Sequence, residues 1–149
     1  MQTLITLFLG LSFFVTDPSL ITSKVVDTES STVTWNAYKV TGSHEGTIKL
    51  KNGELEFEDD QLVGGQFTID MTTIACTDMK GGGAAKLEGH LKSADFFGVE
   101  KFPMSTFNIT KVVSRGTAGA YKITGDLTIK DKTNQISFNA ILDLSLIHI

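Results

Sequence analysis

Short runs in which apolar and polar residues alternate dominate the chain between residues 30 and 144. A period of two is typical of β-strands that bury one face and expose the other. The apolar positions of each run therefore fall on one side of a strand, and turn residues separate one run from the next. The runs lie at residues 32–40, 46–60, 64–74, 105–113, 121–130 and 135–144. We count the run at 46–60 as two strands, which predicts seven strands in total.

The pair Asn52-Gly53 lies in the middle of the run at 46–60. Asn-Gly is the strongest two-residue hairpin signal, because both residues tolerate positive φ. We therefore expect a tight turn at this pair. The inward-facing residues on its two sides would be Ile48, Leu50, Leu55 and Phe57.

Strands with a single apolar face must stack on a second layer or form a closed sheet. Closure into an up-and-down barrel suits the tight turns, and it also removes exposed strand edges. About eight strands give an interior that side chains nearly fill, or that holds one small ligand. We predict an all-β, up-and-down antiparallel barrel with a short helical insert, as a single domain over residues 24–143.

The insert spans residues 75–103 and does not alternate. Gly81, Gly82 and Gly83 are typical of a loop, and no GxxxxGK[ST] phosphate loop is present. The following stretch "AAKLEGHLKSADFF" is long enough for two to three helical turns. Leu87 and Leu91 are four residues apart and would share a face.

Both ends of the chain differ from the body. Residues 4–15, "LITLFLGLSFFV", form an uncharged apolar run that is too short to span a bilayer and resembles the core of a secretory signal peptide. We expect a signal peptide over residues 1–23, cleaved between Ser19 and Ser23; a first buried strand is the alternative. The last six residues, "LSLIHI" (144–149), are what the end of a transposase sequencing adapter encodes. We expect a non-native tail there and a barrel that lacks its last strand.

Composition and isolated reactive residues narrow the function. The net charge of −4 argues against nucleic-acid binding. Cys76 is the chain's one cysteine and would need a base such as His44 or His90 beside it to act as a nucleophile. No His pair has helical metal-ligand spacing, so we predict no metal site and no catalytic residues.

Three blocks of the chain resemble the YceI-like, polyisoprenoid-binding family. They are "LEGHLKSADFFGVEKFPMSTF" (87–107), "GDLTIKDKT" (125–133), in which Asp131 replaces the usual glycine, and "GSHEGTIKLKNGEL" (42–55). The resemblance implies a lipocalin-like barrel with a long internal channel, export to the periplasm or beyond, and no cofactor. It also implies a long-chain amphiphile as partner, such as an isoprenoid quinone or a polyprenyl lipid. A homodimer is compatible with the sequence.

An apolar barrel lumen can hold a long chain by many weak contacts, with few polar anchors. The insert would then seal or line the lumen, although its phenylalanines could equally pack as ordinary core. Two alternatives stay open: a lipid-modifying enzyme with a histidine base, and a stress-related structural module with incidental lipid. The expected lumen residues are Trp35, Phe67, Ile69, Met71, Leu91, Phe96, Phe97, Phe102, Phe107 and Phe138, with His44 and His90 as polar groups near the ligand.

Overall fold

The computed structural model describes residues 19–40 and 42–143. The tail at 144–149 and most of the expected signal peptide, residues 1–18, lie outside the described residues. Residues 19–23 of that expected segment are described, and the last three of them are the first three residues of β1, which spans Ile21–Val25.

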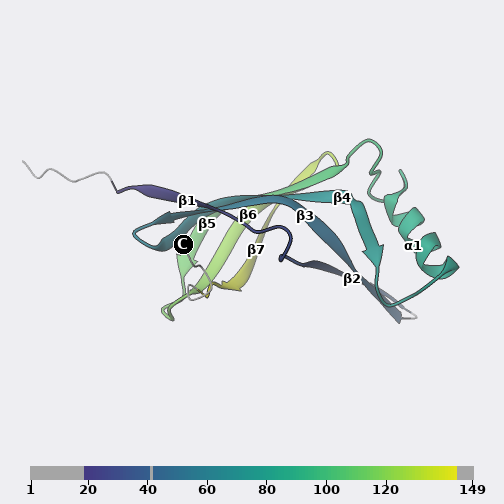
Figure 1. Ribbon diagram of the computed structural model, residues 1–149, viewed down its shortest axis with the longest axis horizontal. Coiled ribbons are helices and arrows are strands. Elements are labelled where there is room, and N and C mark those ends of the chain that lie inside the picture. The colour runs from purple at the N-terminus through teal and green to yellow at the C-terminus, as the bar shows by residue number, and fades with distance from the viewer. Residues whose placement is uncertain (1–18, 41, 144–149) are drawn as a thin grey trace, which may run out of the picture.

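The described residues form one antiparallel sheet of seven strands and one helix (Figure 1). The strand order is β1-β3-β4-β5-β6-β7, and β2 also pairs with β3. β1 and β2 follow each other along the same edge of β3, because they pair with its second half and its first half respectively. After β1, the elements are β2 (Val33–Lys39), β3 (Gly42–Glu58), β4 (Gln61–Cys76), α1 (Gly82–Lys92), β5 (Met104–Ser114), β6 (Ala120–Ile129) and β7 (Lys132–Ile141).

The predicted turn at Asn52-Gly53 was wrong. β3 continues through this pair, and Asn52 and Gly53 pair with Thr68 and Phe67 of β4. The turn lies instead at Asp59-Asp60, whose φ angles of 47° and 61° are both positive. Two successive positive φ angles are what a type I′ hairpin needs, and aspartate tolerates them better than most residues. The predicted total of seven strands holds because β1, which was not predicted, replaces the strand lost at this merger.

β3 and β4 are the longest strands, with 17 and 16 residues. Their pairing shifts register at three points, between Thr47 and Lys49, between Leu50 and Asn52, and between Glu56 and Phe57. Each irregularity bends the pair and increases its twist. The long hairpin can therefore curve around the apolar side of the sheet, as a flat one could not.

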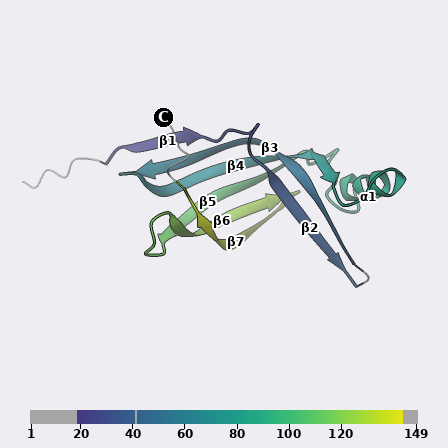
Figure 2. The ribbon, with the colours of Figure 1, turned by 60° about the horizontal axis from the view of Figure 1, so that its bottom comes forward.

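The sheet is not closed. Among the described residues, β7 pairs with β6 alone and β2 pairs with β3 alone. Figure 2 shows β2 and the start of β3 running away from the other strands as a two-stranded arm. β7 is exposed along nearly all of its length, including Ile136 and Phe138. The expected barrel is thus present as a curved, open sheet.

The core divides into two clusters along the sheet. One lies beside α1, at one end of the sheet in Figure 1, and joins Leu91 and Val99 to Ile48, Met71 and Ile74. The other lies further along and contains Phe57, Leu62, Phe107, Tyr121 and Ile123. α1 has 11 residues, and no helix in the described part of the chain is long and apolar enough to cross a bilayer.

Candidate ligand-binding cavity

The concave side of the sheet holds two adjoining chambers. The helix-end chamber has a volume of about 450 Å³ and lies beside α1, with Trp35, Met71, Leu91, Phe96 and Phe97 in its wall. The distal chamber, also about 450 Å³, lies further along the sheet. Its wall includes Leu50, Leu55, Leu62, Phe67, Phe107, Ile109, Tyr121, Ile123, Phe138 and Ala140.

Val33, Ile69 and Leu127 line both chambers, so the chambers adjoin at these three side chains. The three come from β2, β4 and β6, which are not neighbours in the sheet. The distal chamber also has the edge strands β2 and β7 in its wall, at Val33 and Phe138. The curvature of the sheet therefore brings its two edges to the same pair of adjoining apolar chambers.

The chambers are apolar and uncharged. None of the described residues that line either chamber carries a charge at neutral pH. The polar lining residues of the helix-end chamber are Thr34, Asn36 and Ser105. Ser105 is 2% exposed, and its Oγ has no hydrogen-bond partner within the described part of the chain. Such a space suits a hydrocarbon chain better than a charged metabolite, because a buried charge needs a partner.

Strand glycines hold two of the aromatic rings of the chambers close to the sheet. Trp35 lies opposite Gly46, and Phe67 lies opposite Gly53. A Cβ at Gly53 would lie 2.8 Å from Phe67 Cδ1, and one at Gly46 would lie 2.5 Å from Trp35 Cζ2. The indole Nε1 also donates a hydrogen bond to the Ala75 carbonyl at 3.2 Å. The rings thus occupy the space of missing side chains, which leaves room in the lumen.

Phe107, in β5, also lies close to a strand glycine, Gly125 of the neighbouring strand β6. A Cβ at Gly125 would lie 2.5 Å from Phe107 Cζ. The ring of Phe107 also packs against Phe138, with 5.6 Å between ring centroids. It is 8% exposed and faces the distal chamber.

A hydrogen-bonded turn after α1 orients Phe96 and Phe97. Ser93 ends the helix, and its backbone N–H and its Oγ both donate to the His90 carbonyl. The Ser93 carbonyl accepts from the N–H groups of Phe96 and Gly98, and Gly98 has a φ of 57°. The two phenylalanine rings meet edge to face, with centroids 4.8 Å apart. The "HLKSADFF" segment therefore places an aromatic wedge, Phe96 and Phe97, at the helix-end chamber.

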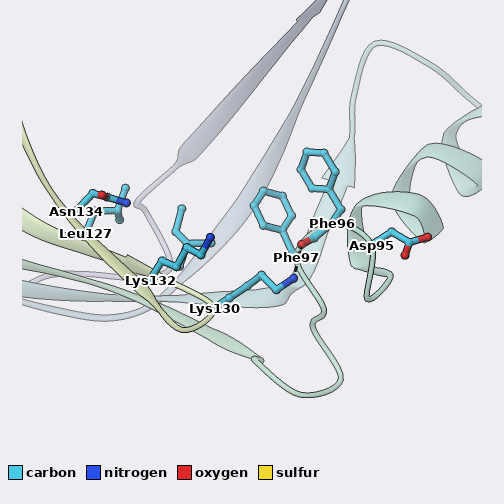
Figure 3. Close-up of a pocket in the computed structure, with 8 residues that line it drawn as sticks. Asp95, Phe96, Phe97, Leu127, Lys130, Lys132 and Asn134 are labelled. Atoms are coloured by element: carbon cyan, nitrogen blue, oxygen red, sulfur yellow. Dashed lines mark hydrogen bonds between the residues drawn. The ribbon is translucent and has the colours of Figure 1, made fainter.

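A third cavity, of about 400 Å³, forms a mouth beside this wedge (Figure 3). Phe96, Phe97, Leu127 and Ile129 line both the mouth and the helix-end chamber. The polar part of the mouth comes from Asp95, Lys130, Lys132 and Asn134. Charged groups are thus found where the apolar space opens.

Lys130 connects the mouth to the wedge. Its Nζ donates to the carbonyls of Phe96 and Ala94, at 3.0 and 3.3 Å. Figure 3 shows the lysine side chain reaching the wedge from the β6–β7 turn, while the Asp95 carboxylate points away from the two rings. Lys130 itself has a positive φ of 57°. The lysine holds the wedge in place from the opposite side of the mouth.

The one cysteine lies in a separate polar cluster at the ends of β3 and β4. Cys76 Sγ donates to Asp78 Oδ1, and His44 Nδ1 lies 2.9 Å from Asp78 Oδ2. These hydrogen bonds, that from Cys76 first, lower the pKa of Asp78 to about 2. The same bond raises the pKa of the Cys76 thiol, which disfavours the reactive thiolate. Asp78 stands between the thiol and the imidazole, so the cluster is not arranged for nucleophilic catalysis.

The structure separates the expected site residues into two groups. Trp35, Phe67, Ile69, Met71, Leu91, Phe96, Phe97, Phe107 and Phe138 line the two chambers. His44, His90 and Phe102 lie outside the three cavities. The His90 ring packs on Phe96, at 5.9 Å between centroids, and the Phe102 ring lies under Lys101 Nζ. Among the described residues, no group of three or more His, Cys, Asp or Glu side chains could hold a metal ion.

Sequence reasoning did not identify Ser105 or Lys130 as site residues. A signal existed for Ser105, because it shares the inward parity of Phe107 and Ile109 in an alternating run. No such signal existed for Lys130, since its contacts are with a segment more than 30 residues away in the chain.

Comparison with known proteins places the chain in a family. The family model described as YceI-like domain matches residues 25–146. A UPF0312 protein of Vibrio campbellii is 30% identical over 122 residues, which cover 78% of this chain and 60% of the relative. A UPF0312 protein of Photorhabdus laumondii is 32% identical over 97 residues, covering 65% of this chain and 47% of the relative. The chain thus spans about half to 60% of the length of these curated relatives.

The fold has a solved counterpart. The crystal structure of Burkholderia cenocepacia BcnA aligns with a TM-score of 0.62 at 24% identity, over 76% of this chain and 69% of that one. At this identity the likeness shows the fold alone. The family match over residues 25–146 confirms the resemblance drawn from the three sequence blocks: this chain belongs to the YceI-like family.

Proposed function

We propose that this protein binds a long-chain amphiphile, of the isoprenoid quinone or polyprenyl type, in the two joined chambers of its curved sheet. The observation that carries the proposal is a pair of adjoining apolar chambers of about 450 Å³ each, whose walls share Val33, Ile69 and Leu127. Charged side chains occur at the mouth beside the helix-end chamber.

The physical support is the additive character of apolar burial. Each CH₂ group moved from water into such a space contributes about 0.8 kcal/mol. A chain that extends through both chambers thus gains affinity without any polar anchor. A compact ligand would occupy one chamber and gain only part of this free energy. The space therefore favours a long, thin hydrocarbon chain over a compact polar substrate.

A binding role also fits the positions of the reactive groups better than catalysis does. His44 and Cys76 share hydrogen bonds with Asp78, outside all three cavities. His90 packs on Phe96 and lines none of the three cavities. A general base must come within hydrogen-bond reach of the bond it acts on.

The test is a titration of delipidated protein with N-phenyl-1-naphthylamine, followed by displacement with prenyl alcohols of increasing length. We expect affinity to rise with each added isoprene unit until the two chambers are filled. Native mass spectrometry of protein purified without delipidation should also show a bound lipid in near-stoichiometric amount. Affinity that is independent of chain length would contradict the proposal.

A blocked lumen supplies the matched control. Ile69→Trp places a large ring where the two chambers meet, and should abolish the gain from chains long enough to pass that point. Val113→Trp adds the same ring on the exposed outer side of β5, where Val113 is 43% exposed, and should leave the length dependence unchanged. Equal binding by both variants would place the ligand outside the chambers.

We further propose that the protein acts after export, on the basis of the apolar run at residues 4–15. The described strand β1 begins at Ile21 and pairs with β3, so removal of the run before this strand would leave the sheet intact. Cell fractionation of the native host with an antibody to this protein tests the location. Mature protein in the cytoplasmic fraction that still begins at Met1 would overturn it.

A further inference from the structure

One buried polar group in the lumen has no partner. Ser105, in β5, is 2% exposed, and its hydroxyl lacks a hydrogen-bond partner among the residues that the structure describes. Buried hydroxyl groups in folded proteins are almost always hydrogen-bonded, because burying one without a partner costs free energy. Alanine or valine at this position would avoid that free-energy cost if the hydroxyl had no binding role.

Ser105 belongs to the wall of the helix-end chamber. Ser105 and Phe107 are two residues apart in β5 and both are buried, so they share the inner face of the strand. Ser105 pairs with Ile69, which lines both chambers, and Ser105 itself lines the helix-end chamber. Ser105 is therefore in the wall of the helix-end chamber, close to where the two chambers adjoin.

We propose that Ser105 hydrogen-bonds a neutral oxygen of the ligand, such as a carbonyl or hydroxyl group, inside the helix-end chamber. This inference rests on the proposed function and narrows its ligand class. A serine hydroxyl can donate one hydrogen bond and accept others, so it serves a ketone, an ester or an alcohol equally. The ligand would then be an amphiphile whose polar group enters the lumen.

A charged group does not suit this position. The described lining of the helix-end chamber provides no cation or anion to compensate a buried charge. One hydroxyl cannot offset the desolvation of a phosphate or carboxylate. Such a head group would instead remain at the mouth, beside Lys130 and Lys132. Ser105 thus favours ligands with a neutral oxygen over ligands with an anionic head.

The test compares three probes that carry the same prenyl chain: geranylgeranylacetone, its deoxygenated hydrocarbon analogue, and geranylgeranyl diphosphate. Each displaces N-phenyl-1-naphthylamine from the wild-type protein, from Ser105→Ala, and from Ser114→Ala. Ser114 lies at the exposed end of the same strand and serves as the control. We expect Ser105→Ala to weaken the ketone by about three- to tenfold and to change the other two probes by less than about twofold.

A stability measurement accompanies the titration. Ser105→Ala removes an unpartnered buried hydroxyl, so the thermal midpoint of the delipidated variant should equal or exceed that of the wild type. An unchanged ketone affinity, or an equal loss for ketone and hydrocarbon, would overturn the role of Ser105. A loss confined to the diphosphate would overturn the choice of a neutral group. A wild-type protein that binds none of the three overturns the proposed function, and this inference with it.

Discussion

Alanine substitution of two phenylalanines in one hydrophobic cluster should distinguish a residue that lines the lumen from a residue of the filled core. Phe57 and Phe107 both belong to the distal hydrophobic cluster, at 2% and 8% exposure. Phe107 lines the distal chamber, whereas Phe57 lines none of the three cavities. We expect Phe57→Ala to cost much more stability than Phe107→Ala, and only Phe107→Ala to weaken ligand binding.

The magnitudes follow from what surrounds each ring. Phe57 is enclosed, so its loss combines the transfer free energy of the ring with the cost of a new cavity, about 3–5 kcal/mol. Phe107 already faces an open chamber, so its removal enlarges a space that exists. The transfer term alone then applies, and we expect about 2 kcal/mol. The lost contact with the ligand should weaken binding by about fivefold, which is about 1 kcal/mol.

Urea denaturation of delipidated protein measures both costs, provided that the m-values of the two variants agree with the wild type. Titration with N-phenyl-1-naphthylamine measures affinity for the same preparations. Equal losses of stability, together with unchanged affinity in both variants, would mean that side chains fill the distal chamber. Phe107 would then be an ordinary core residue.

Three further changes test other parts of the site. Gly53→Ala should push the Phe67 ring into the distal chamber and reduce affinity for long chains; unchanged affinity in a displacement assay would refute the close packing of ring on glycine. The lowered pKa of Asp78 contributes stability that is fully present above its ordinary value of 3.8 and is lost as pH falls through about 2. Asp78→Asn should therefore reduce the change of the thermal midpoint with pH over that range. Lys130→Met should accelerate probe dissociation in stopped-flow measurements by loosening the wedge, whereas Lys132→Met should not.

Period-two alternation was sufficient to predict most of the sheet. It indicated β2 and β4 to β7, because each turns one apolar face toward the chambers or the core. It did not indicate β1, whose residues are almost all exposed and are held by pairing with β3. Unlike the edge strand β7, β1 has no side chain in either chamber, so no inward-facing apolar set marks it in the sequence.

The sequence correctly predicted a short helix in the insert. The role of the "HLKSADFF" motif could be seen only in the structure. Leu87 and Leu91 do pack on the same cluster, as their spacing predicted. Ser93 and Gly98 shape the turn after the helix through backbone hydrogen bonds, which no local sequence pattern specifies. Lys130 completes the wedge from a distant hairpin, and only the folded chain brings the two together.

The error at Asn52-Gly53 and the openness of the lumen have one physical origin. A glycine in a strand usually marks a bulge, a turn or a close approach by another group. The sequence favoured the turn, yet Gly53 serves the close approach, because the Phe67 ring lies where its side chain would be. At Gly46 and Gly125 the rings of Trp35 and Phe107 approach in the same way, together with the backbone carbonyls of Ala75 and Asn108. A curved sheet with a hollow lumen needs apolar side chains that cover its inner surface without filling the lumen. An aromatic ring that lies against a glycine meets this need. Strand glycines paired with aromatic residues are therefore the feature by which an open lumen differs from a filled core in this chain.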